Sequence, residues 1–155
     1  MPKKVNVKKE KEFLLVYVDE SDEFLEAMIH ACNIAKNENL GIILLYIIAD
    51  ENFRHWKGVE SIMKAEKKDE AKELLDKHIA FIKEKNKIQV KSFIKTGDKL
   101  ESLIKVMNNK RLKVKNLVLG LAMDKTENNK IISSLTGVSR KKLTLPIIVV
   151  PGKIK

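Results

Sequence analysis

The residues best suited to chemistry in this sequence follow a short apolar run near its amino end. Asp19 and Ser21 come directly after the run Phe13 to Val18 and stand at the start of a helical pattern. In one interpretation, Ser21 or Asp19 only caps that helix by accepting hydrogen bonds from its free amides. In the other, the Asp19 carboxylate accepts a hydrogen bond from an adenine or a ribose bound beside the strand end. The residue types fit both interpretations.

A second group of candidates lies in the last third of the chain. Gly120 ends another apolar run, and Ser133 and Ser134 stand near the start of the last helical pattern. Glycine lets a backbone approach a ligand closely, and the amides at a helix amino end suit phosphate. These residues predict an anion site if the fold brings them next to Asp19.

The elements that would position these residues alternate along the chain. Apolar runs of strand length are followed by segments in which apolar residues recur at helical spacing. The predicted strands are 13–18, 42–48, 88–94, 114–120 and 147–150, and the predicted helices are about 21–39, 56–85, 100–107 and 131–143. This alternation predicts an α/β fold, with a five-stranded parallel doubly wound sheet, Rossmann-like, and helices on both faces.

Two local patterns refine this prediction. Gln89 and Lys91 alternate with apolar residues in the third strand, which should therefore lie at an edge of the sheet. Asp98, with Glu101 three residues later, has the spacing of a capping pair for the third helix.

Several of these segments together resemble the universal stress protein family. The resemblance covers nearly all of 13–152 and rests on Asp19 after the first strand, the LLYII of the second, the Gly97-Asp98 turn, the Val118-Leu119-Gly120 strand end and the terminal PIIVVPG. It implies a single domain over 1–155, with the core at about 13–152, of the adenine nucleotide alpha hydrolase-like kind.

The resemblance also implies where a nucleotide would bind. Nucleotide-binding members carry a glycine after the fourth strand, two residues, a second glycine, nine residues, and then a glycine with serine or threonine. The corresponding positions of this chain are Gly120, Met123, Ser133 and Ser134. Two of the three glycines are missing, and Met123 has a side chain where the family has none, which predicts weak or absent nucleotide binding. Tyr17 and Ile47 would border the adenine.

For members without the complete loop, the resemblance implies a regulatory or stress-response module with no assigned catalysis. It also implies a homodimer in which the edges of the two last strands meet. In this chain that edge consists of Ile147, Ile148, Val149 and Val150. An exposed apolar edge of this kind needs covering.

Two alternative functions remain open. One is an adenine-nucleotide binder or slow ATPase that takes ATP with Mg²⁺ through Asp19, Gly120, Ser133 and Ser134. The other is a basic module for nucleic acid, motivated by the formal net charge of +10. Only three of the 31 basic residues are arginines, and the lysines are interleaved with acids, which favours a solvated surface over a nucleic-acid site.

The motif content argues against other functions. The sequence has no Gly-x-Ser-x-Gly elbow, Walker loop or dinucleotide fingerprint, so we expect no enzyme. The three histidines lack the spacing of a zinc site, and the single Cys32, near the buried face of the first helix, predicts neither a disulfide nor a metal cage. The absence of a long apolar run predicts a cytoplasmic protein that does not enter the membrane.

Overall fold

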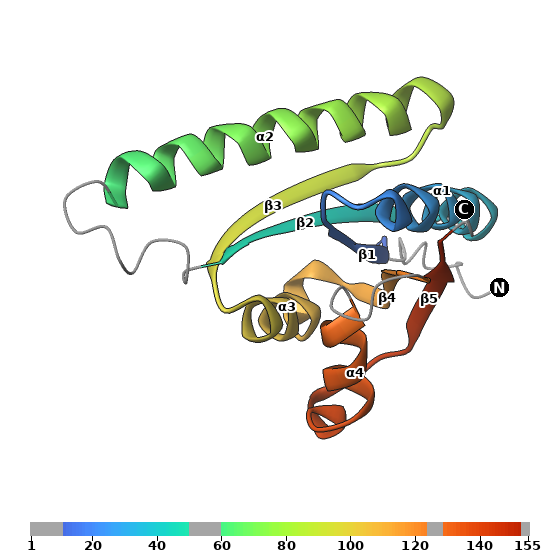
Figure 1. Ribbon diagram of the computed structural model, residues 1–155. Helices are drawn as coiled ribbons and strands as arrows, with labels where there is room; N and C mark the ends of the chain where they lie inside the picture. Colours follow the sequence, from blue (N-terminus) through green and yellow to red (C-terminus); the bar gives the residue numbers. More distant parts are fainter. Residues whose placement is uncertain (1–10, 50–59, 124–128, 153–155) are drawn as a thin grey trace, which may run out of the picture.

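The computed structural model describes residues 11–49, 60–123 and 129–152, in which strands and helices alternate as predicted (Figure 1). The elements in chain order are β1 (Phe13–Val18), α1 (Asp22–Glu38), β2 (Gly41–Ala49), α2 (Glu60–Lys85), β3 (Val90–Gly97), α3 (Lys99–Met107), the 3-10 helix η2 (Lys110–Leu112), β4 (Val114–Leu121), α4 (Lys130–Thr136), the 3-10 helix η4 (Arg140–Lys142) and β5 (Ile147–Pro151). The predicted start of the second helix near residue 56 lies outside the described residues.

The five strands form one sheet in the order β3-β2-β1-β4-β5, and every neighbouring pair is parallel. The predicted five-stranded parallel sheet is therefore confirmed, and so is the position of β3 at an edge. β1 lies at the centre, and all six of its residues are buried. A strand covered on both faces needs apolar residues at every position, which explains the continuous FLLVYV run.

Side chains that alternate along the strands separate two layers of core. On one face, Leu14 and Val16 pack with residues of α1 and α2, among them Phe24 and Leu75. On the other face, Leu15 and its neighbours pack with residues of α3 and α4. Figure 1 shows α2 above the sheet, with α3 and α4 below it. Helices thus cover both faces, as the doubly wound pattern predicts.

The ends of three elements show how local residues set their limits. Ser21 caps α1, since its Oγ accepts a hydrogen bond from the amide of Phe24 at 3.3 Å. Asp98 caps α3 as predicted, because its Oδ1 accepts from the amide of Glu101 at 2.9 Å. The third strand runs over Val90–Gly97, later than the predicted 88–94.

The last helix differs most from its prediction. A single helix over 131–143 is wrong, because α4 ends at Thr136 and Gly137 follows as its C-cap. The amide of Ser139 then donates to the carbonyl of Ser134 at 2.7 Å, which closes the turn. Val138 beyond it is 95% exposed, so this position gains no burial. Glycine after a helical run is the usual stop signal, and it outweighs the apolar spacing here.

Cys32 is buried on α1 as predicted, and burial raises the pKa of its thiol. Within the described ranges, no helix has the length and apolar character needed to cross a membrane.

Candidate nucleotide crevice

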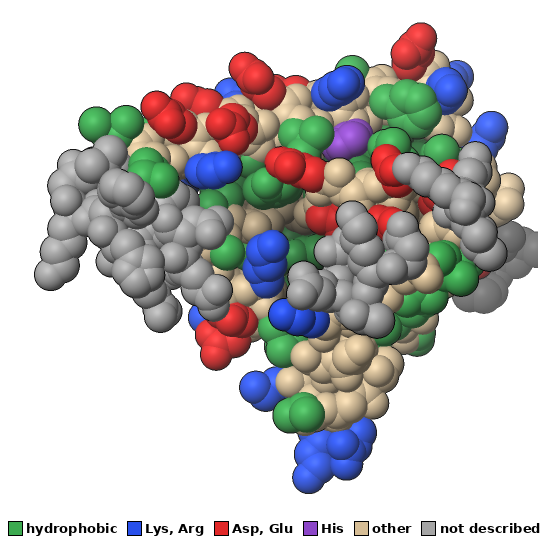
Figure 2. All heavy atoms as spheres, in the orientation of Figure 1, with side chains coloured by type: hydrophobic (Ala, Val, Ile, Leu, Met, Phe, Trp, Pro, Cys, Tyr) green, Lys and Arg blue, Asp and Glu red, His purple; other side chains and the backbone are tan. Residues whose placement is uncertain are grey.

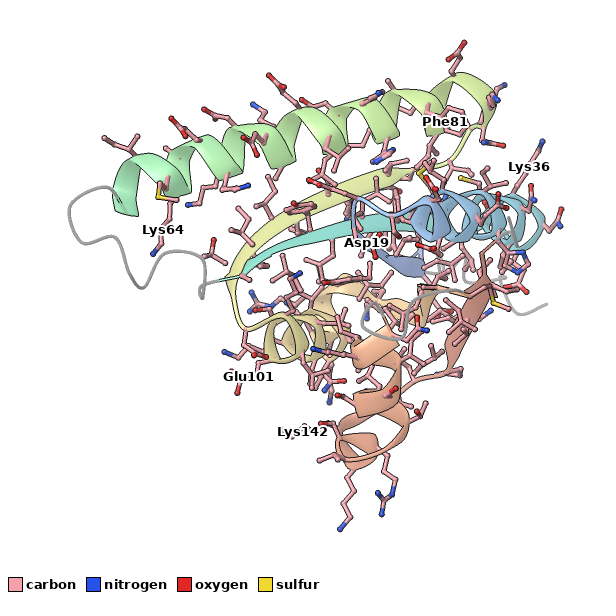
Figure 3. All side chains as sticks on the ribbon, in the orientation of Figure 1. Asp19, Lys36, Lys64, Phe81, Glu101 and Lys142 are labelled. Atoms are coloured by element: carbon pink, nitrogen blue, oxygen red, sulfur yellow. The ribbon has the colours of Figure 1, made fainter. Side chains whose placement is uncertain are left out.

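The candidate site lies where the carboxyl ends of β1 and β4 meet. The chain leaves β1 through α1 toward β2, whereas it reaches β4 from the far edge through α3, so the winding direction reverses between these two strands. In sheets of this kind the reversal leaves a crevice outside the carboxyl ends of the strands. Asp19 comes directly after β1, and Figure 3 shows it between the two helical layers. The topology therefore brings Asp19 near Gly120 at the end of β4.

The Asp19 carboxylate is bonded to the start of α1. Its Oδ1 accepts the backbone amide of Ser21 at 2.8 Å and also accepts the Ser21 hydroxyl. Ser21 in turn caps the helix through Phe24, so the two polar residues form one chain of bonds. The capping interpretation of this segment is thus correct for Ser21, and Asp19 positions the cap. A carboxylate used in this way has less capacity left for a ligand.

Gly120 lies against the backbone of the first turn of α1. A Cβ at this position would be 2.7 Å from the carbonyl oxygen of Glu23 and 2.8 Å from its carbonyl carbon. Real Cβ atoms do not come this close to backbone atoms, so packing of α1 on β4 by itself requires glycine here. The glycine that the resemblance assigns to a phosphate loop therefore has a structural reason of its own.

The two residues expected to border an adenine are part of the core. Tyr17 is 9% exposed and Ile47 is 4% exposed, and both belong to the cluster on the α3 and α4 face. Burial, followed by the nearby charge of Asp19, raises the pKa of the Tyr17 hydroxyl, which keeps it neutral. The structure places these two predicted residues on neighbouring strands and in the same core cluster.

Just after β4, the side chain of Asn129 bonds to the backbone of Ala122, which the sequence did not predict. We call this pair of hydrogen bonds the Asn129 clamp. The side-chain amide of Asn129 donates to the carbonyl of Ala122 at 2.9 Å, and its Oδ1 accepts the amide of Ala122 at the same distance. The side chain thus pairs with one residue as a neighbouring strand would. Asn129 directly precedes α4, where an asparagine indicates a helix cap, but its side chain makes no cap bond. Only the fold shows that its partner is Ala122.

The remaining predicted loop residues lie around this clamp. Met123 follows Ala122 and is 49% exposed. Ser133 and Ser134 are the fourth and fifth residues of the short helix α4, rather than residues of its first turn. Because the amides from the fourth helical position onward bond within the helix, these two serines offer a ligand their hydroxyl groups and not their amides.

Carboxylates set the charge of the crevice on the α1 and α2 side. Burial raises the pKa of the Tyr46 hydroxyl, and the charges of Glu20 and Glu70 and a hydrogen bond with Glu20 add to the increase. Figure 2 shows acidic side chains gathered over α2 and beside the start of α1. Within the described part of the chain, no group of three or more His, Cys, Asp or Glu side chains could hold a metal ion.

Solved structures share this architecture. Universal stress protein UspA from Lactobacillus plantarum superposes with a TM-score of 0.74 at 19% identity, over 91% of this chain and 98% of that one. A universal stress protein in complex with cAMP matches at a TM-score of 0.60 and 14% identity, over 92% and 98%. The universal stress protein from Archaeoglobus fulgidus in complex with dAMP matches at 0.59 and 12%, over 91% and 98%.

No family model matches the sequence, and no curated protein is similar enough to be counted as a match. The likeness is therefore one of structure. The chain has the universal stress protein fold over more than nine-tenths of its length, as the resemblance implied.

Proposed function

We propose that this protein is a cytoplasmic, homodimeric regulatory module of the universal stress protein type, which acts in a stress response and binds nucleotides weakly or not at all. The shared fold supports the type of module. The observation that carries the weak binding is that the predicted nucleotide contacts already serve the protein itself. Asp19 holds Ser21, Gly120 packs against Glu23, and Tyr17 is part of the core.

Charge supports the same conclusion. The carboxylates of Asp19, Glu20 and Glu70 all act on Tyr46, so they lie on one side of the crevice. A triphosphate placed there would meet like charges in a partly desolvated site, where repulsion is stronger than in water. These carboxylates therefore oppose binding of ATP.

A calorimetric titration of the full chain with Mg-ATP, cAMP and dAMP tests this proposal, after the ultraviolet spectrum has excluded a co-purified nucleotide. We expect no saturable binding below millimolar ligand. Micromolar binding of any of the three that is lost on the substitution Asp19→Ala would contradict the proposal. Binding that persists in Asp19→Ala would locate the ligand outside this crevice.

The second candidate function is an adenine-nucleotide binder or slow ATPase. It is favoured by the neighbours of the same fold that are in complex with cAMP and dAMP. In this case Asp19, Gly120, Ser133 and Ser134 would contact the nucleotide, and Met123 would turn away to admit it. The titration described above decides between the two candidates, and hydrolysis becomes worth assaying only if ATP binds.

The proposed dimer uses the free edge of β5. The amide of Leu117 donates to the carbonyl of Pro146 at 3.1 Å, and the amide of Gly152 donates to the carbonyl of Leu121 at 2.9 Å. Backbone amides along a strand point alternately to its two sides, and the Gly152 amide points toward β4. The amides of Ile147 and Val149, which are an odd number of residues away, therefore point away from β4. Val149 is 38% exposed. An unpaired apolar edge is a template for a second strand, here the same strand of another copy.

Light scattering after size exclusion tests the dimer. We expect a dimer at micromolar concentration for the natural chain and for the control Val149→Thr. Val149→Pro should give a monomer with unchanged circular dichroism, because it removes an outward amide without touching the bonds to β4. A natural chain that is monomeric, or a Val149→Pro variant that stays dimeric, would overturn the proposed interface.

A further inference from the structure

A basic hollow lies at the end of the sheet opposite the crevice. The strand register pairs Phe13 with Gly41 and with Val114, and Ile42 with Val90, so the amino ends of these four strands lie side by side. A shallow cavity of about 620 Å³, largely open to solvent, lies there. Its charged lining residues are Lys11, Lys91, Lys110, Arg111 and Lys113. We call these five residues with the cavity the basic pocket.

Among the described residues that line this pocket, every charged side chain is basic. Lysines elsewhere form ion pairs, as Lys67 does with Glu70 at 3.5 Å and Lys115 does with Glu38 at 3.3 Å. Five like charges around one cavity repel each other and together create a positive potential, which a multiply charged anion would relieve.

The backbone that carries these side chains is held in place by hydrogen bonds. The amide of Phe13 donates to the carbonyl of Lys113 at 2.9 Å, and the amide of Ile42 donates to the carbonyl of Gln89 at 2.9 Å. The side chain of Asn109 caps the turn that presents Arg111, since its Oδ1 accepts the Arg111 amide at 3.1 Å. The cations thus project from three ordered segments that are distant in sequence, which preorganises the pocket for an anion.

The floor of the pocket limits what can bind. The Phe13 side chain is only 4% exposed, and the ammonium of Lys91 lies 4.7 Å from the centre of its ring. The one aromatic ring of the lining is therefore covered, so it offers no open face for a base to stack on. A ligand here would be recognised by its charge and compactness.

We propose that the basic pocket binds a compact oligophosphate, a short chain of three or more phosphate groups with no requirement for a base. Lysine and arginine side chains bind phosphate oxygens through charge-assisted hydrogen bonds, and Arg111 adds a bidentate fork. The proposal is independent of the crevice between β1 and β4, because the two sites lie at opposite ends of the sheet.

Calorimetric titration of the full chain with inorganic tripolyphosphate tests this proposal. We expect saturable binding with one ligand per chain, weakened by added salt as expected for an ionic site. The double substitution Lys110→Gln and Arg111→Gln should weaken it at least about tenfold, because two charge-assisted hydrogen bonds are lost. Both side chains are exposed, and circular dichroism checks that the variant folds.

Matched controls make the test specific. The substitutions Lys68→Gln and Lys72→Gln on the exposed surface of α2 remove the same charge and should leave the affinity within about twofold. Asp19→Ala should likewise have no effect, which separates this site from the proposed crevice. A second pocket variant, Lys91→Gln, should weaken binding in the same direction as the double variant.

Three results would overturn the proposal. The first is the absence of saturable tripolyphosphate binding at low salt. The second is an equal loss of affinity in the pocket and α2 double variants, which would show attraction by net charge alone. The third is tighter binding of a short single-stranded RNA or duplex DNA than of tripolyphosphate, lost in the pocket variant, which would make a nucleic-acid backbone the occupant.

Discussion

The substitution Gly120→Ala separates the two roles that this glycine could have. If the glycine were required only for a phosphate to approach, alanine would reduce ligand binding and leave the free protein unchanged. The structure predicts the opposite, because the added Cβ would be 2.7 Å from the carbonyl oxygen of Glu23 and 2.8 Å from its carbonyl carbon. The contacts are with backbone of the first turn of α1, so no side-chain rotation can relieve them.

The expected magnitude follows from the cost of overpacking. Optimal separations of such atoms are roughly 3.5 Å, so the start of α1 must move away from β4 by several tenths of an ångström. Displacements of this kind cost about 1 to 3 kcal/mol in a well-packed core. At a urea m-value of about 2 kcal/mol per molar, a loss of about 2 kcal/mol lowers the unfolding midpoint by about 1 M. Urea unfolding followed by circular dichroism, without any nucleotide, measures it.

Gly152→Ala is the matched control, since it faces the same residue. A Cβ at Gly152 would be 2.7 Å from the Cγ of Glu23, which belongs to a flexible side chain, and 3.4 Å from the carbonyl oxygen of Leu121. The side chain can turn aside, so we expect a loss below about 0.5 kcal/mol. An unfolding midpoint of Gly120→Ala equal to that of the natural chain, or an equal loss of stability in both alanine variants, would refute the packing role of Gly120.

Three further predictions concern other groups of the molecule. Asn129→Ala removes both bonds to Ala122 and should lower the free energy of unfolding by about 1 to 3 kcal/mol, and Asn129→Asp should be destabilised at least as much. Urea unfolding measures both variants, and an unchanged midpoint would contradict the clamp. Burial lowers the pKa of His78, so as the pH falls the unfolded chain is protonated at this residue before the folded chain is. The stability contribution of His78 should therefore be complete above the unfolded pKa of about 6.5 and should decrease as the pH drops below it. Unfolding curves between about pH 7.5 and 5 measure this dependence, which His78→Asn should reduce. Asp98→Ala should cost about 1 kcal/mol through loss of the α3 cap, whereas Asp98→Ser should recover most of it.

The fold was readable from the sequence because its signals are local and repeated. A continuous apolar run such as Phe13 to Val18 predicts a strand buried on both faces, and helical spacing between such runs predicts the crossovers. Caps were equally readable, since Asp98 needs only its own helix to act. Boundaries were weaker, as α4 shows, because the apolar spacing continues beyond Gly137 although the helix ends there.

The candidate site was less predictable. The sequence placed Asp19 and Gly120 at strand ends, and the topology confirms that these ends adjoin. What these residues contact depends on how α1 packs across β4 and β5, which no local pattern encodes. The contact of Gly120 with Glu23 and the clamp of Asn129 on Ala122 both join segments that only the folded chain brings together.

By itself, then, the sequence determined the α/β class, the parallel sheet and the resemblance that located a crevice, since each depends on residue periodicity and on residues close in the chain. Only the tertiary structure placed Tyr17 and Ile47 in the core and Gly120 against the first turn of α1. It also gathered Lys11, Lys91 and Arg111, far apart in sequence, around one cavity. The physical reason is that packing and electrostatic fields act between neighbours in space, and the order of residues along the chain does not specify those neighbours.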